Sequence, residues 1–306
     1  MATENLTMTT DIQVEARRID FVTSFARNWN ALREIMGISR MIRKEPGTVL
    51  RSYTATVELE DGAVPEGEKI PLSKATIKEA AHEDLKIEKY GKGITIEDVD
   101  KYGADIAIDM TDEAFRNELL ALVMNGFYTF AKTGTLKNTA DNFQMGVALA
   151  VGSVKSKFKS MRLDGSRVNI FVNTMDAYRY LGAAQLTVQS QFGLEYVENF
   201  MGADKMFLSA DEDIPAGTII AIPTNNMIDY YADPSNSAYA RMGLRYTVDP
   251  ELPMLGFAVE GDYSDATGKL WAIMGHKLRA EYLDAVAVVT VSGAAGASDD
   301  GGAAAE

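Results

Sequence analysis

The sequence lacks cysteine altogether and contains only two histidines among its 306 residues. Without cysteine the chain has no disulfide, no thiolate ligand and no thiol nucleophile. The histidines, His82 and His276, lie far apart and neither has a second histidine at helical spacing, so we expect no histidine-based zinc site. A Gly-x-Ser-x-Gly motif is also missing, which argues against the usual arrangement of a serine hydrolase.

Basic residues and long apolar runs are also scarce. The chain has 44 acidic and 30 basic residues, which give a formal net charge of −14. A surface that binds nucleic acid needs a basic face to neutralise the phosphates, so we expect no nucleic-acid-binding surface here. The longest apolar runs, 119–124 and 285–291, are too short to cross a bilayer, and residues 1–11 lack the features of a signal peptide. We therefore expect a soluble protein with no membrane partner.

The remaining motifs with potential chemistry are weak. Residues 261–269 resemble a phosphate loop, but six residues rather than four separate Gly261 from Gly268, and Leu270 stands where Ser or Thr belongs. The acidic residues at 211–213, and Asp262 with Asp265, lack the spacing of a calcium loop and are interpreted as solvated turns. No spacing singles out a carboxylate pair for acid–base catalysis. We expect no catalytic residue, no cofactor and no metal site.

A strict alternation of side chains covers residues 51–60. Arg51, Tyr53, Ala55, Val57 and Leu59 fall on one side of the chain and the residues between them on the other. This period of two predicts a strand. The segment 61–71 is rich in Gly and Pro, and extended chain resumes near 75–77 and 85–87. The pattern predicts a projecting hairpin that has little to bury in its own molecule and is useful mainly against another subunit.

A helical period follows the hairpin and a short strand at 93–96. It runs from about Glu97 to Lys132, with Gly134 just past its end, and would approach roughly 50 Å if Gly103 does not interrupt it. An amphipathic helix by itself is ordinarily the core helix of a domain. The residues predicted to form its core face are Ile106, Met110, Phe115, Leu119, Leu122 and Phe130.

The rest of the chain predicts an α+β arrangement. A helix is expected at 12–35, a connector at 136–141, and a compact unit from 142 to about 235, with helices at 143–161 and after Thr174 and strands at 168–172, 205–209 and 218–222. The strand 270–274 is expected to pair with 278–283, and 285–291 to return the chain to the sheet beside the long helix. Residues 293–306 have too little apolar surface to order themselves.

One segment of the hairpin carries a resemblance to a known family. An extended loop holding Val64, Pro65, Glu66, Gly67, Glu68, Lys69, Ile70, Pro71 and Leu72, followed by a short strand and a long helix, resembles the major capsid proteins of tailed bacteriophages. Their fold is named after phage HK97, and the order of elements matches over residues 45–292. No catalytic signature exists to match, so the resemblance depends on the order of elements and on chain length.

The resemblance implies an α+β HK97-like fold with six parts. These are an N-terminal arm and helix (1–50), an extended β-hairpin loop (51–92), a peripheral domain with a spine helix (93–141), an axial domain (142–240), return strands of the peripheral domain (241–292) and a disordered tail (293–306). The expected assembly contacts of the extended loop are Glu58, Glu60, Val64, Pro65, Glu66, Glu68, Lys69 and Lys74. Tyr230 and Tyr231 are expected in an axial loop, as an interface anchor or as a domain edge.

The same resemblance implies a structural protein and not an enzyme. It would form the hexamers and pentamers of a virion capsid, assembled in the bacterial cytoplasm, and would enclose double-stranded DNA without sequence-specific binding. A scaffolding protein, a portal and decoration proteins are the implied partners. Some relatives join a loop lysine to an asparagine of a neighbour; here Lys69 or Lys74 and Asn225 or Asn226 are the candidates, although ion pairs are the expected role of the lysines.

Two alternatives stay open from the sequence. The nearer is an encapsulin-like nanocompartment shell protein, which has the same fold but encloses a cargo enzyme. The more distant is an α+β enzyme or ligand-binding protein, which would be monomeric and would have a deep apolar pocket.

Overall fold

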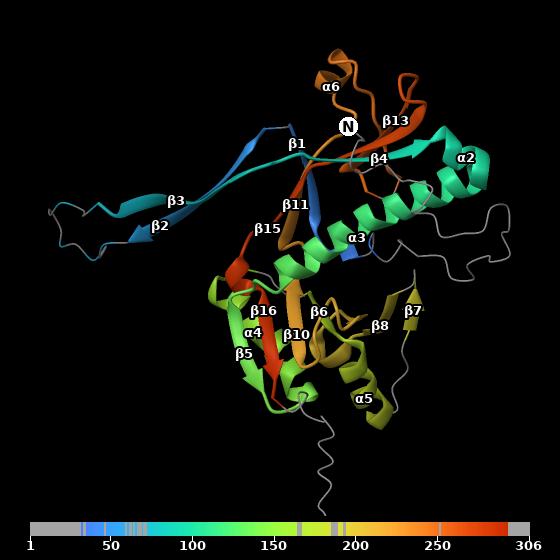
Figure 1. Ribbon diagram of the computed structural model, residues 1–306. Helices are drawn as coiled ribbons and strands as arrows, with labels where there is room; N and C mark the ends of the chain where they lie inside the picture. Colours follow the sequence, from blue (N-terminus) through green and yellow to red (C-terminus); the bar gives the residue numbers. More distant parts are fainter. Residues whose placement is uncertain are drawn as a thin grey trace, which may run out of the picture.

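The computed structural model describes residues 32, 35–45, 47–58, 60, 63, 65, 69, 72–163, 167–184, 189–191, 194–250 and 252–292. Nearly all of the helix expected at 12–35, and the whole tail expected at 293–306, lie outside these residues. The described chain forms two bodies joined by a short sheet, with a hairpin that projects far to one side (Figure 1).

The lower body in Figure 1 is built on a seven-stranded sheet. Its strands, in spatial order, are β5 (Leu136–Ala140), β16 (Ala287–Val291), β10 (Thr218–Pro223), β6 (Val168–Asn173), β9 (Lys205–Ser209), β8 (Leu194–Glu198) and β7 (Gln189–Gln191). The pairs β5–β16 and β6–β9 are parallel, and the other neighbours are antiparallel. Helices α4 (Phe143–Ser160) and α5 (Thr174–Ala184) cover one face, and a 3₁₀ turn follows at Phe200–Gly202.

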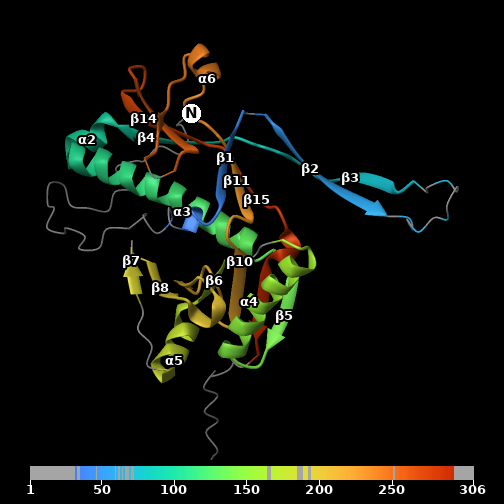
Figure 2. The same cartoon turned by 180° about the vertical axis from the view of Figure 1, so that it is seen from behind.

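The upper body contains a four-stranded antiparallel sheet. Its strands, in spatial order, are β12 (Thr247–Val248), β13 (Leu255–Asp262), β14 (Thr267–Met274) and β4 (Glu88–Thr95). The helices α2 (Ile96–Tyr102) and α3 (Thr111–Ala131) run beneath it, and the short helix α6 (Ser237–Arg241) lies at its upper edge (Figure 2). A 3₁₀ turn at Leu283–Ala285 leads down into β16.

A three-stranded sheet connects the two bodies. It consists of β1 (Arg40–Lys44), β11 (Met227–Ala232) and β15 (His276–Ala280), with β1 parallel and β15 antiparallel to the central β11. Its core side carries Met227 and Leu278, which belong to the same apolar cluster as the inner face of α3. The connecting sheet is therefore part of the core and not a loose linker.

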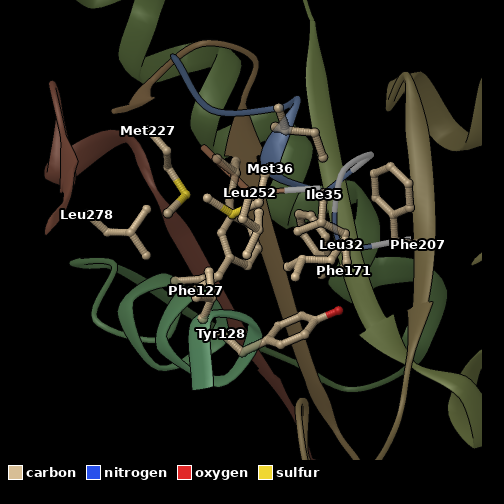
Figure 3. Packing of buried hydrophobic residues seen from close by; sticks show 14 of the residues in the cluster. Leu32, Ile35, Met36, Phe127, Tyr128, Phe171, Phe207, Met227, Leu252 and Leu278 are labelled. Atoms are coloured by element: carbon tan, nitrogen blue, oxygen red, sulfur yellow. The ribbon is translucent and has the colours of Figure 1, made fainter. Parts of the chain in front are cut away.

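The centre of the core is an aromatic group between α3 and the seven-stranded sheet (Figure 3). The Phe171 ring stacks on the Phe207 ring at 5.0 Å and meets the edges of Phe127 at 5.6 Å and Tyr128 at 6.1 Å. Tyr128 shares a hydrogen bond of 3.1 Å with Ser209, so its buried hydroxyl is satisfied. Every residue of β6 is buried, because α4 and α5 cover one face of the strand and α3 the other.

The long helix is interrupted, which corrects part of the prediction. α2 ends at Tyr102, and Gly103 adopts φ 87°, a conformation that glycine reaches without strain. The chain then enters a π-helical segment, Asp105–Met110, which leads directly into α3. The Thr111 hydroxyl donates a hydrogen bond of 2.6 Å to the Ala107 carbonyl at this junction. The helix expected to start near Glu97 therefore becomes two helices.

Two of the expected core positions on this helix are wrong for the isolated chain. Ile106 and Leu119 are buried, and Phe115 and Phe130 pack against the core, but Met110 is 53% and Leu122 46% exposed. The π-helical turn changes the angular step per residue, so a helical period counted from the start of the predicted helix near Glu97 loses its phase there. The buried stripe of α3 consists instead of Leu119, Leu120, Val123, Phe127, Tyr128 and Ala131.

The expected strand pairings also need correction. Residues 136–140 form strand β5 and not a polar connector. Strand β14 pairs with β13 and β4, and not with β15, while β16 belongs to the seven-stranded sheet and not to the sheet above α3. The start of α5 is capped by Asn173, whose Oδ1 accepts from Met175 N at 2.8 Å, whereas the expected cap, Thr174, donates to the Ser209 carbonyl. Alternation identifies strands but not their partners.

Candidate assembly surface

The projecting hairpin consists of β2 (Val49–Glu58) and β3 (Lys74–Asp84), which pair antiparallel with a bulge between Ser52 and Tyr53. It is attached to the body at its root, where Leu50 and Leu85 are 6% and 3% exposed and Leu85 N donates to the Thr48 carbonyl. Further out, no other element of the described chain lies against it (Figure 1). The sequence prediction of a hairpin here is confirmed.

The register of the pairing gives the outer hairpin two different faces. Val57 lies opposite Ala75, and Ile77 is two residues along β3 on the same side. These three residues, the hairpin's apolar face, are exposed: Val57 by 55% and Ile77 by 69%. The other side carries Glu58 opposite Lys74 and Thr56 opposite Thr76. The ribbon is amphipathic, and its apolar face has no cover.

The residues predicted for the extended loop divide into two groups. Glu58, Glu60, Pro65, Lys69 and Lys74 are exposed, and Glu60 N donates a hydrogen bond of 3.3 Å to the Ser73 hydroxyl. Val64, Glu66 and Glu68 lie outside the described residues. The prediction stressed the charges and missed Ile77 and Leu72, which is 91% exposed. Only the cross-strand register puts Val57 and Ile77 on one face, and the sequence does not give that register.

The elements at the end of the upper body away from the hairpin, α2 and the β13–β14 hairpin among them (Figures 1 and 2), line a groove. It has a volume of about 450 Å³ and is formed by β4, α2, the π-helical segment and the β13–β14 hairpin. We call it the apolar groove, since its walls include Ile94, Ile96, Val99, Ile108, Val259 and Tyr263. Val259 is 80% exposed, Ile96 60%, and the Tyr263 side chain is fully exposed. Sequence reasoning did not identify this surface, which is built by two stretches far apart in the chain, 92–112 and 259–270.

Ion pairs border the apolar groove. Lys92 binds Asp112 and donates to the Thr111 hydroxyl, and burial lowers the pKa of Lys92 although Asp112 opposes the shift. On the β13–β14 turn, Lys269 Nζ lies 2.7 Å from Asp262 and 3.5 Å from Asp265. The hydrogen bond from Lys269 and those from Ser264 hold the pKa of Asp262 well below its ordinary value. These charges are already paired, so the groove presents mainly apolar surface.

The carboxylates of the acidic turn at 211–213 are held within the fold. The Asp211 carboxylate accepts hydrogen bonds from Asn173 Nδ2 and Ala216 N, while burial raises the pKa of Asp213. Among the residues that the structure describes, no group of three or more His, Asp or Glu is placed to hold a metal ion. In the same part of the chain, no helix is both long enough and apolar enough to cross a membrane.

Tyr230 and Tyr231 do not lie in an axial loop, which corrects that prediction. Both belong to β11, the central strand of the connecting sheet, and both are half-buried. Lys44 lies 5.8 Å from the centre of the Tyr230 ring, and Tyr231 packs against the core. Strand β11 continues one residue past these tyrosines, to Ala232, and the turn that follows is closed by the hydrogen bond from Asn236 N to the Asp233 carbonyl.

Of the two asparagines considered for a cross-link, Asn226 is buried and its side chain is hydrogen-bonded within the fold. It is 4% exposed, its amide donates to the Tyr282 carbonyl at 3.0 Å, and its oxygen accepts from Tyr282 N at 2.9 Å. Asn225 is exposed and has φ 65°. A cross-link at Asn226 would replace the Nδ2 that donates to the Tyr282 carbonyl, and it would have to form at a buried side chain, so Asn225 is the accessible member of the pair.

Similarity to solved structures defines the class of the fold. The chain has the HK97-like fold of viral and encapsulin shell proteins, which confirms the predicted fold class. The similarity is structural, at 12% sequence identity or less in the cases given below. No protein-family model matches the sequence, and neither does any curated protein.

Three solved structures illustrate the similarity. The capsid asymmetric unit of cyanophage A-1(L) has a TM-score of 0.60 at 12% identity, over 92% of this chain and 98% of that one. The mature capsid of bacteriophage PhiM1 has a TM-score of 0.59 at 11% identity, over 92% and 93%. The holo-SrpI encapsulin complex from Synechococcus elongatus PCC 7942 has a TM-score of 0.50 at 12% identity, over 84% and 86%.

Proposed function

We propose that this chain is a structural subunit that self-assembles into the icosahedral capsid shell around the genome of a tailed phage. Its fold is that of phage capsid proteins over more than nine-tenths of the chain. In this assignment the body with the four-stranded sheet and α3 is the peripheral domain, and the body with the seven-stranded sheet is the axial domain. We propose no enzymatic activity for the subunit.

The observation that carries the proposal is the uncovered apolar face of the hairpin. An isolated two-stranded hairpin is at best marginally stable in water and needs a surface beneath it. Here Val57 and Ile77 lie on one face, far from the body and more than half exposed. Burying such a side chain contributes roughly 1.5–3 kcal/mol. A second copy that covers the face would supply this free energy to every subunit of a shell.

The apolar groove is the surface on a second copy that we propose receives the hairpin. The hairpin and the groove lie at opposite ends of the same body, so one chain cannot join its own two surfaces (Figure 1). A contact between unlike surfaces on identical subunits is head-to-tail, and it closes into rings when the rotation allows. Hexamers and pentamers are such rings.

Further partners are part of the same proposal. A scaffolding protein, a portal and decoration proteins would complete a virion assembled in the bacterial cytoplasm. The net charge of −14 is compatible with a shell that encloses double-stranded DNA without gripping its phosphates. Loop residues such as Glu58, Glu60 and Lys74 would make polar contacts at the edges of the subunit interface.

Electron microscopy of the expressed full-length chain tests the proposal directly. We expect closed particles with pentameric and hexameric clusters, and the hairpin of each subunit lying across a neighbour. A chain that stays monomeric at all concentrations, with the hairpin free in solution, would contradict a shell function.

A nanocompartment shell is the second candidate, because the same fold occurs in the SrpI encapsulin complex. The two functions differ in what the particle encloses. Particles purified from the native source should contain double-stranded DNA if the chain forms a capsid, and a co-purifying enzyme if it forms a nanocompartment. Nuclease-protected DNA and peptide mass spectrometry distinguish the two contents.

Assembly should depend on ionic strength. Subunits with a charge of −14 repel one another, and screening shortens the reach of that repulsion from about 30 Å at 0.01 M salt to about 8 Å at 0.15 M. We expect assembly, followed by light scattering, to be slower at the lower salt concentration. Rates that do not change with salt would show that long-range repulsion does not limit the association.

A further inference from the structure

The segment between β11 and β12 forms a small projection with an exposed apolar end. Residues 240–245, at the end of α6 and just after it, are all exposed. Met242 is 73% and Leu244 45% exposed, and Arg241 and Arg245 flank them in the sequence. We call these four residues the α6 tip. Methionine and arginine are both enriched in protein–protein interfaces, so the composition of the α6 tip is that of a contact surface.

The base of this projection is fixed to the body. Asn236 Nδ2 donates a hydrogen bond of 2.7 Å to Glu45 Oε2, and Asn236 is buried. Pro234 packs so closely on Gly256 that a Cβ on the glycine would lie 2.3 Å from Pro234 Cβ. Because the base is already ordered, binding through the α6 tip costs less conformational entropy than binding through a loose loop.

The two arginines of the α6 tip have no counter-charge in the described part of their own chain. No described carboxylate forms an ion pair with Arg241 or Arg245. The chain as a whole is acidic, with a net charge of −14. A basic tip on an acidic molecule favours contact with an acidic surface of another copy, because the local attraction opposes the general repulsion between copies.

An acidic surface of this kind lies on the helical chain that follows Gly103. Asp105, Asp109 and Glu113 recur at steps of four, are exposed, and form no ion pair with any described residue. Like charges at this spacing repel one another along a helix. Met110, which is 53% exposed, directly follows Asp109 in the chain. We call these four residues the acidic corner, and none of them lines the apolar groove.

Two other acidic surfaces of the described chain are already paired or hydrogen-bonded. Asp262, on the β13–β14 turn, forms an ion pair of 2.7 Å with Lys269. Asp211 accepts hydrogen bonds from Asn173 Nδ2 and Ala216 N. The acidic corner instead combines carboxylates that lack a described counter-charge with an exposed apolar side chain. The α6 tip shows the same combination with the opposite charge.

We propose that the α6 tip of one copy binds the acidic corner of another copy in the shell. In this contact the arginines face the row of carboxylates, and Met242 and Leu244 cover Met110. Helix α6 and the junction of α2 with α3 lie apart in both views, with the β13–β14 hairpin between them (Figures 1 and 2). The tip and the corner of one chain therefore do not meet. The contact rests on the proposed shell function and adds a charge-dependent contact to that of the hairpin.

A charge exchange tests the contact through the concentration at which the full-length chain forms particles, followed by light scattering. The tip variant is Arg241→Glu with Arg245→Glu, and the corner variant is Asp105→Arg with Asp109→Arg. Each substitution changes the charge by two units, so the net charge of −14 becomes −18 in the tip variant and −10 in the corner variant. We expect both variants to need a concentration higher by roughly tenfold or more, where tenfold corresponds to about 1.4 kcal/mol.

The chain that carries both exchanges separates a specific contact from general repulsion. Its net charge is again −14 and its tip and corner again have opposite charges, so it should assemble at a concentration close to that of the wild type. The control Lys159→Glu with Arg162→Glu, at the exposed end of α4, also has a net charge of −18 and should assemble more readily than the tip variant. A combined chain that assembles no better than the two variants overturns the proposal, as does a corner variant that assembles more readily than the wild type.

Met242→Ser gives a second measurement in which every charge is kept. It should also raise the concentration needed for assembly, because the contact loses apolar surface. Urea unfolding of the unassembled variant should match that of the wild type, since the side chain is 73% exposed. If the wild type forms particles and the tip variants assemble equally well, the contact is overturned and the shell function stands. A wild type that never forms particles overturns both.

Discussion

Replacing both Val57 and Ile77 with aspartate should abolish particle formation while leaving the subunit folded. Both side chains are more than half exposed in the single chain, so the change costs the isolated fold little. In the proposed contact each would bury apolar surface worth roughly 1.5–3 kcal/mol, and a buried aspartate adds a desolvation cost. We expect the subunit contact to weaken by roughly 100-fold or more, measured as the concentration at which particles appear.

The matched control for this prediction lies on the other face of the same ribbon. Thr56 and Thr76 are directly opposite each other on the polar face, so aspartates there change the charge equally without altering the apolar face. We expect that control to assemble at a concentration close to that of the wild type. If both double variants fail equally, added negative charge and not the apolar face is responsible.

A mixing experiment separates a head-to-tail contact from a symmetric one. The hairpin variant keeps an intact groove, while a second variant, Val259→Asp with Ile96→Asp, keeps an intact hairpin. Each variant alone should be monomeric. Mixed in equal amounts, they should form dimers that cannot grow, because only one hairpin–groove contact is available per pair. Sedimentation velocity should detect these dimers, and their absence would contradict the hairpin–groove contact.

The second large effect is expected at the centre of the core. Phe171 is fully buried between Phe207, Phe127 and Tyr128, and both faces of its strand are covered. Phe171→Ala should destabilise the unassembled chain by about 3–5 kcal/mol, because the truncation leaves a cavity that the covered strand cannot close. Domains of this kind are typically stable by about 5–15 kcal/mol, so the variant would be marginal.

Urea unfolding of unassembled chain measures this loss. The control is Tyr263→Ala, which removes an aromatic ring of similar size from a fully exposed position and should change the free energy of unfolding by about 0.5 kcal/mol or less. A loss at Phe171 of less than about 1 kcal/mol would mean that α3 and the sheet move together to fill the space.

The local pattern of the sequence predicted several elements correctly. Strict alternation identified the first strand of the hairpin, and the helix expected at 143–161 is α4, Phe143–Ser160. The strand at 168–172 was also expected, since a short and mostly apolar run favours a buried strand, and every residue of β6 is buried. These features depend on residues close together in the chain, where the repeat of the backbone fixes which side chains share a face.

The sequence pattern failed to predict other features, either because the backbone departs from its regular repeat or because the pairing strand is distant in the chain. The π-helical segment at Asp105–Met110 shifts the phase of the helix, which is why Met110 is exposed. Strand β5, whose residues LKNTA look like a connector, is a strand because it pairs in parallel with β16, about 150 residues later. No local propensity reports a pairing over that distance.

By itself the sequence determined that this protein has no cysteine chemistry, carries an excess of acid, and extends a hairpin with nothing of its own to cover it. Only the tertiary structure decided that Ile77 shares the apolar face of Val57, and it alone assembled the groove from β4, α2, the π-helical segment and the β13–β14 turn. The physical reason is the distance in sequence over which each property is set. Composition and side-chain periodicity depend on neighbouring residues, whereas strand register and packing depend on contacts between segments far apart in the chain.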